Sequence, residues 1–97
     1  MKIVPIVFTM ERCPYCHDLK NKLKESNIEF KEIDTDKKEN EVLYESFSKK
    51  VESDFLPAVV IGKKALLPDK SFKTIDDAVK MIKEYLQELS DRENRSD

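Results

Sequence analysis

Apolar residues near the start of the chain form a short β-branched run, the pattern of a strand that is buried on both faces of a sheet. The run covers residues 3–8 (IVPIVF) and is bounded by polar residues. Because proline cannot donate a hydrogen bond to a neighbouring strand, we expect either that pairing starts near Ile6 or that the Pro5 nitrogen faces no neighbouring strand. A weaker strand is predicted at residues 29–34 (EFKEID), because this segment lies between two helical patterns.

A second β-branched run predicts a hairpin in the later part of the chain. Pro57 precedes apolar residues 58–61, and Gly62, the only glycine, marks a turn into residues 65–67. Two short apolar segments joined by a glycine turn are typical of antiparallel strands.

Three segments carry apolar residues at the three- and four-residue spacing of amphipathic helices. They cover residues 14–26, roughly 39–50, and 74–89. Pro14 suits the first helical position, and Thr74 is a candidate N-cap of the last helix. The expected inward-facing residues are Cys16, Leu19 and Leu23 in the first helix, Leu43, Phe47 and Val51 with Tyr44 alongside in the second, and Ile75, Ala78, Val79, Ile82, Tyr85, Leu86 and Leu89 in the third.

The predicted order is strand, helix, strand, helix, hairpin, helix. The first strand-helix-strand unit implies a parallel pair with a right-handed crossover, and the hairpin adds antiparallel pairing. We therefore expect an α/β fold in which helices cover a small mixed sheet. A chain of 97 residues is too short for two separate cores. Residues 1–89 are predicted to form one domain, followed by a polar C-terminal tail at residues 90–97.

Composition narrows the classes of function. The 18 basic and 20 acidic residues give a formal net charge of −2, and no basic block is interleaved with aromatic residues. We therefore do not expect the protein to bind nucleic acid electrostatically. The longest apolar run is far shorter than the ~18 residues of a membrane span, and no signal peptide precedes it. We expect a cytoplasmic monomer with no nucleic-acid or membrane partner.

Both cysteines lie in one short stretch, Cys13-Pro14-Tyr15-Cys16. In the predicted fold Cys13 lies at the strand-to-helix junction, where unpaired backbone N–H groups and the helix dipole favour a thiolate. Such settings lower a cysteine pKa from ~8.5 to between about 3.5 and 7.5. Cys16 shares the inward face of Leu19 and should be less accessible and less acidic. The pattern predicts thiol-disulfide exchange, in which Cys13 attacks a substrate disulfide and Cys16 resolves the mixed disulfide.

Residues beside the cysteines fit this chemistry. Arg12 adds positive charge, Tyr15 offers a flat surface beside the sulfur, and His17 adds charge only when protonated. Three other interpretations are a structural disulfide, a zinc site with His17 as third ligand, and two ordinary buried thiols. Exchange is favoured because so short a loop stabilises by only ~2 kcal/mol and zinc sites usually need four ligands. We expect no metal.

Several segments are similar to the glutaredoxin family of the thioredoxin superfamily. They are Phe8-Thr9 followed by the Cys13–Cys16 motif, residues 27–36, and Leu56-Pro57 followed by residues 58–62. The resemblance spans roughly residues 3–89. It implies a four-stranded mixed sheet with three flanking helices in the order βαβαββα, and a cis peptide bond before Pro57, next to the dithiol. It also implies reduction of protein disulfides or glutathione mixed disulfides, with glutathione as co-substrate and no tightly bound cofactor.

The resemblance further implies a glutathione-binding surface. Its candidate residues are Arg12, Tyr15, Leu56, Pro57, Asp76 and Asp77. The Ile75-Asp76-Asp77 segment resembles the part of the family that holds the γ-glutamyl end, although plain helix capping explains both acids as well. Met10 stands where the family commonly has a lysine that contacts the glycine carboxylate, and Arg12 is the candidate substitute. Residues 66–74 replace the family's Gly-Gly pair without any glycine.

Three alternatives remain open. The protein is a redoxin that a flavoprotein reductase reduces, or a cluster-binding protein in which Cys13 from two subunits and two glutathiones hold a [2Fe–2S] centre, or a non-catalytic interaction module. The missing lysine and Gly-Gly pair favour the first of them, whereas the lack of a glycine-rich rim and the proline after Cys13 argue against the second. Lys63-Lys64 and residues 70–73 are expected near the rim of the site, where they could select acidic partners or simply remain solvated.

Overall fold

The computed structural model of the chain describes residues 3–93. Its elements are β1 (Ile6–Thr9), α1 (Pro14–Glu25), β2 (Lys31–Asp34), a short 3-10 turn η1 (Lys38–Asn40), α2 (Glu41–Val51), β3 (Ala58–Ile61), β4 (Lys64–Leu66) and α3 (Ile75–Glu93). The strands form one sheet in the order β2-β1-β3-β4. β1 and β2 are parallel, whereas β1–β3 and β3–β4 are antiparallel. The predicted mixed sheet and the order βαβαββα are confirmed.

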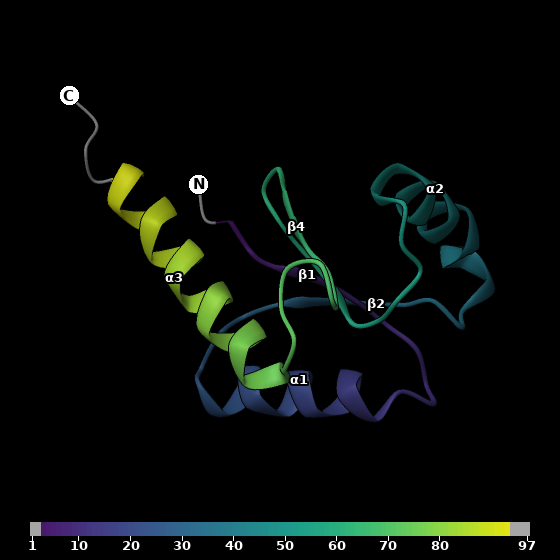
Figure 1. Cartoon of the computed structure of the whole chain (residues 1–97), viewed down its shortest axis with the longest axis horizontal. Coiled ribbons are helices and arrows are strands. Elements are labelled where there is room, and N and C mark those ends of the chain that lie inside the picture. Colours follow the sequence, from purple (N-terminus) through teal and green to yellow (C-terminus); the bar gives the residue numbers. More distant parts are fainter. Residues whose placement is uncertain (1–2, 94–97) are drawn as a thin grey trace.

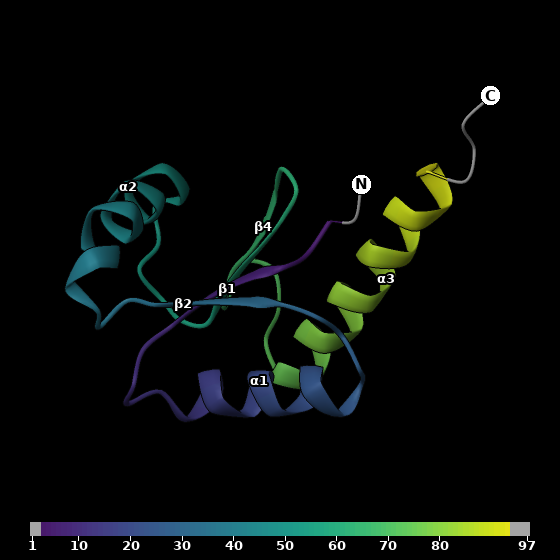
Figure 2. The same cartoon turned by 180° about the vertical axis from the view of Figure 1, so that it is seen from behind.

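Helices cover both faces of this sheet (Figures 1 and 2), with α1 and α3 on one face and α2 on the other. Because successive strand residues point to opposite faces, Val7 and Phe8 of β1 belong to different halves of the core. One half contains Val7, Leu19, Leu23, Val59, Ile61, Leu66, Phe72, Ile75, Ala78, Val79 and Ile82. The other contains Phe8, Ala58 and Leu67, with Tyr44, Phe47 and Val51 of α2 packed against them.

The predicted inward face of α2 was wrong at one position. Leu43 is 50% exposed, whereas the rings of Tyr44 and Phe47 lie 5.9 and 4.5 Å from that of Phe8. Four-residue steps rotate about 40° beyond a full turn, so a stripe built only from such steps drifts around the helix. Steps of three and four through Tyr44, Phe47 and Val51 stay on the face that meets the sheet.

The last helix begins where the sequence predicted. The Thr74 hydroxyl oxygen accepts a hydrogen bond from the Asp77 backbone N–H at 3.1 Å, which confirms the N-cap. α3 continues to Glu93, beyond the expected end at Leu89, and the rest of the predicted tail lies outside the described residues. None of the helices within residues 3–93 has the length and apolar composition needed to cross a bilayer. The proposed boundary at residue 89, between the domain and the C-terminal tail, stays a prediction.

Candidate active site

The two cysteines lie where β1 leads into α1. They form a disulfide with Cα atoms 5.2 Å apart. Cys13 is the N-cap residue of α1 with extended backbone angles, and its Sγ accepts a hydrogen bond from the Cys16 N–H at 3.1 Å. Pro14 occupies the first helical position, where its missing N–H costs nothing. The first sulfur therefore lies against a backbone donor of the first helical turn, as predicted.

Both cysteines are buried in this disulfide form. Cys13 is 4% exposed and Cys16 is fully buried. Cys13 is thus the more exposed of the two, as expected, but the difference in exposure is small. The accessible surface around the pair comes from its neighbours Arg12, Pro14 and Tyr15, which are all exposed.

The loop before Cys13 is held by two hydrogen bonds. The His17 ring donates from Nε2 to the Glu11 carbonyl oxygen at 2.9 Å, and the Glu11 N–H donates to Asp36 Oδ2 at 2.6 Å. His17 is therefore tied to this loop. Arg12, in contrast, makes no ion pair or hydrogen bond with any other residue in the described range, so its charge remains available to an incoming group.

A groove of about 390 Å³ lies beside the dithiol and collects residues from three segments. The Leu56-Pro57 peptide bond on its wall is cis, as the resemblance implied. The groove brings together three of the candidate residues, Tyr15, Leu56 and Pro57. Its full lining is Tyr15, Phe55, Leu56, Pro57, Pro68, Asp69, Phe72, Lys73, Thr74 and Ile75.

The two acidic candidates do not line this groove. The Asp76 carboxylate accepts a hydrogen bond from Lys22 Nζ of α1 at 2.6 Å, and this hydrogen bond raises the pKa of the Lys22 ammonium. Asp77 is exposed, and its N–H is used by the Thr74 cap. The geometry therefore favours the capping interpretation for the backbone of this segment and commits Asp76 to a contact between α1 and α3.

One predicted basic pair lies at the wrong end of the sheet. β3 starts at Ala58, which pairs with Phe8 near the dithiol, whereas Lys64 pairs with Ile61 at the hairpin turn. Three strand residues span about 10 Å, so Lys63 and Lys64 lie away from the site rim. The later basic segment fits better, because Lys73 lines the groove.

A polar cluster under the end of β1 was not predicted from the sequence. Glu32 Oε2 accepts hydrogen bonds from the Thr9 hydroxyl at 2.6 Å and from Lys20 Nζ at 2.8 Å. Burial alone would raise the pKa of the Glu32 carboxyl, but the hydrogen bonds from Lys20 and Thr9 lower it below its ordinary value. The cluster joins β1, α1 and β2, and so fixes the strand and helix that flank Cys13. Its members are distant in sequence and share no motif, so no local signal could have found them.

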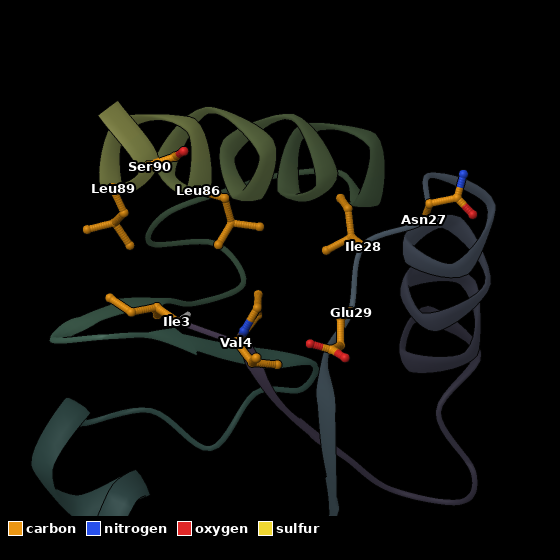
Figure 3. A pocket seen from close by; sticks show the side chains of 9 residues that line it. Ile3, Val4, Asn27, Ile28, Glu29, Leu86, Leu89 and Ser90 are labelled. Atoms are coloured by element: carbon orange, nitrogen blue, oxygen red, sulfur yellow. The ribbon is translucent and has the colours of Figure 1, made fainter. Parts of the chain in front are cut away.

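A second cavity, of about 330 Å³, lies at the other end of the sheet (Figure 3). Leu86 and Leu89 point from α3 toward Ile3, which precedes β1. The cavity also includes residues 27–29, which follow α1. Because Cys13 lies at the start of α1 and after the end of β1, this cavity is separate from the dithiol.

The glutaredoxin family model matches residues 6–66, a stretch that contains the dithiol motif and the cis proline. The chain belongs to the glutaredoxin family. No curated protein sequence matches it significantly.

Solved structures place this glutaredoxin family member among thioredoxin-like folds. The thioredoxin-like protein BC3987 is 26% identical, with a TM-score of 0.56 over 66% of this chain and 85% of that one. The glutaredoxin from Archaeoglobus fulgidus is 25% identical, with a TM-score of 0.58 over 67% and 74% of the two chains. A buckwheat glutaredoxin in complex with glutathione has a TM-score of 0.65 over 87% and 72%, and at 16% identity it shows the shared fold alone.

As in other proteins with a Cys-x-x-Cys pair, the glutaredoxin motif of this chain is able to form a disulfide. Opening that bond by two electrons gives two thiols that lie next to each other, one at the helix N-terminus and one on the buried face of the helix. Such a pair can exchange with another disulfide.

Proposed function

We propose that this protein is a thiol-disulfide oxidoreductase in which Cys13 is the nucleophile and Cys16 the resolving cysteine. The observation that carries the proposal is the position of Cys13 Sγ as N-cap of α1, where it accepts the Cys16 N–H at 3.1 Å. Backbone donors and the positive end of the helix dipole stabilise a negative sulfur. No side-chain base is needed for this ionisation.

The proposed reaction has two steps. The Cys13 thiolate attacks one sulfur of a substrate disulfide, and the other substrate sulfur leaves as a thiolate and takes a proton from solvent. Cys16 then loses its proton and attacks the Cys13 sulfur of the mixed disulfide, which releases the second substrate thiol. Two electrons pass from the protein dithiol to the substrate, and the Cys13–Cys16 disulfide forms.

Serine variants of the two cysteines test these roles. Cys13→Ser should abolish exchange, because it removes the attacking sulfur. Cys16→Ser should accumulate a mixed disulfide on Cys13, because the second step lacks its nucleophile. Intact-protein mass spectrometry after mixing with a disulfide substrate measures both results. If Cys16→Ser lost exchange completely while Cys13→Ser kept it, the assigned roles would be reversed.

For the electron donor we propose glutathione. Family membership supports this choice, as does the buckwheat relative that was solved with glutathione. Unpaired Arg12 beside Cys13 is the proposed partner of a glutathione carboxylate. Tyr15, Leu56 and Pro57 form the proposed binding wall. Of the two acids, Asp77 is the better candidate for the ligand amine, because Asp76 is paired with Lys22.

A flavoprotein reductase is the alternative donor. It is favoured because, within residues 3–93, the groove lining holds no unpaired cation. The oxidised protein would be incubated with glutathione, and separately with thioredoxin reductase and NADPH, before free thiols are counted. We expect glutathione to open the disulfide and release two thiols per chain. Thiols that appear only with the reductase would establish the alternative, and no thiols in either mixture would reject the oxidoreductase role.

The proposed partners are therefore glutathione and proteins that contain disulfides. We further propose a cytoplasmic location and a monomeric state. Size-exclusion chromatography with light scattering checks the latter, and a mass of twice the chain would contradict it.

A further inference from the structure

Two exposed aromatic rings stand at the groove beside the dithiol. Tyr15 is 68% exposed and Phe55 is 61% exposed, and both line the groove. Several large apolar side chains are exposed within residues 3–93, and these two are the aromatic ones among them. Exposed aromatic side chains that gather at one concave surface mark binding sites more often than scattered aliphatic ones do.

The charges of the groove cancel one another. Its acidic side chain, Asp69, forms an ion pair with its basic one, Lys73, at 3.1 Å. Nearby Lys70 donates to the carbonyl oxygens of Val51 and Glu52, each at 3.1 Å. A ligand that enters the groove therefore meets little uncompensated charge.

The rest of the lining is largely apolar. Leu56 and Pro57 form one wall, while Phe72 and Ile75 are buried beneath the opening. A volume of about 390 Å³ lies at the lower end of the range for binding pockets, about 300–1,000 Å³. Such a space suits one or two side chains of an extended peptide. An apolar side chain would gain from leaving water there, whereas a charged one would lose hydration without finding an unpaired charge among the lining residues.

We propose that the groove selects protein disulfides in which an aromatic or large aliphatic residue adjoins the half-cystine that Cys13 attacks. Phe55 and Tyr15 are the specificity-determining residues, and they contact that neighbouring side chain. The inference rests on the proposed exchange function, since the side chain reaches the groove as its disulfide meets Cys13. The neutral, apolar character of the groove defines this class of substrate.

Two cystine peptides that differ only in the residue next to the half-cystine, phenylalanine or serine, test this inference. The reduced protein is mixed with each peptide for a single turnover, quenched with acid and separated by chromatography. We expect the phenylalanine peptide to react about tenfold faster, within the range for one apolar group in a pocket. The ratio of the two rates is compared among variants, so a general loss of reactivity cancels.

Phe55→Ser should lower this ratio to about threefold or less, while Phe55→Leu, which stays apolar, should retain most of it. Val42→Ser is the matched control, because Val42 is 76% exposed on α2 and does not line the groove. It should leave the ratio unchanged. Since both residues are exposed, neither substitution should prevent folding.

A ratio near one for the unaltered protein would overturn the inference, as would a ratio that Phe55→Ser leaves intact or that Val42→Ser lowers equally. Reduction of the small disulfide 5,5′-dithiobis(2-nitrobenzoate) by the same preparation separates the two proposals. If this reagent is reduced but the peptide ratio is near one, only the groove inference fails. If the reduced protein does not react with the reagent, the exchange function itself fails.

Discussion

Around Cys13, the backbone supplies the contacts that matter and the side chains supply few. The Cys16 N–H donates to the sulfur, while His17 is tied to the Glu11 carbonyl. Arg12 is the adjacent residue that keeps an available charge. Charged side chains should therefore change the reactivity of Cys13 only modestly, and the backbone at the start of α1 should account for most of it.

Arg12→Gln tests this division. In the reduced protein we expect it to raise the Cys13 pKa by less than one unit, because exposed charges contribute only about 0–1 kcal/mol. The shift should vanish near 1 M salt, where the screening length is about 3 Å. Alkylation rates at several pH values measure it, with Arg92→Gln on α3 as control. An equal shift in both variants would show that Arg12 has no local role.

At single residues, the sequence could predict only features that carry a local signal. The cysteine pair, the N-cap threonine and the glycine turn each carry a local signal and were predicted. For Asp76 the sequence left ligand binding and helix capping open, and its hydrogen bond with Lys22, 54 positions away, has no local signal. Phe55 carries no periodicity, since it lies in the irregular segment between α2 and β3, and its exposure became informative only once the groove was known.

Among the elements, α2 is linked to the segment that forms one wall of the groove. Its Tyr44 and Phe47 rings pack on Phe8, near the end of β1. The Tyr44 hydroxyl donates to the Asp54 carbonyl oxygen at 2.9 Å, which ties the helix to the segment that carries Phe55. Burial, with a smaller contribution from the Asp54 charge, raises the pKa of Tyr44, so this hydroxyl keeps its proton at neutral pH.

Truncation of the buried side of α2 should cost far more stability than truncation of its exposed side. Phe47→Ala should lower the free energy of unfolding by about 1.5–3 kcal/mol, because it removes a ring stacked on Phe8. Leu43→Ala should change it by less than about 0.5 kcal/mol. Urea unfolding measures both. Equal losses would restore the original prediction that Leu43 faces the core.

Helix and strand positions were easier to predict than the directions of their side chains. Apolar spacing located every helix, because amphipathic periodicity is a local property. The drift of Leu43 and the distance of Lys63-Lys64 from the site depend on how helix and hairpin meet the sheet. Both depend on packing between segments that are distant in sequence, namely α2 on Phe8 and β3 on β1.

For the whole molecule, the cluster of Thr9, Glu32 and Lys20 joins the two parallel strands to the helix that carries the dithiol. The dithiol and its groove occupy one end of the sheet, and the apolar cavity beside Leu86 occupies the other (Figure 3). The dithiol and the groove beside it thus lie together where β1 ends and α1 begins.

This cluster predicts a pH dependence of stability. Because the folded-state pKa of Glu32 lies below its ordinary value of 4.5, the stabilisation is present above pH 4.5 and is lost as pH falls through the folded pKa. Glu32→Gln should therefore be less stable than the unaltered protein at pH 7, by about 0.2–1 kcal/mol for a partly exposed pair, and this deficit should shrink in acid.

Urea unfolding at several pH values measures the deficit, with Glu84→Gln on the exposed side of α3 as control. A deficit that stays constant or grows as the pH falls would contradict the ionic role of Glu32.

The most direct test of the account is the ionisation of Cys13 in the reduced protein. Alkylation with iodoacetamide, followed for each cysteine by mass spectrometry from about pH 4 to 10, reports the thiolate fraction of both sulfurs. We expect Cys13 to titrate below about pH 7.5 and to react faster than Cys16 at neutral pH. A Cys13 that titrates near 8.5, as free cysteine does, or that reacts no faster than Cys16, would contradict the account.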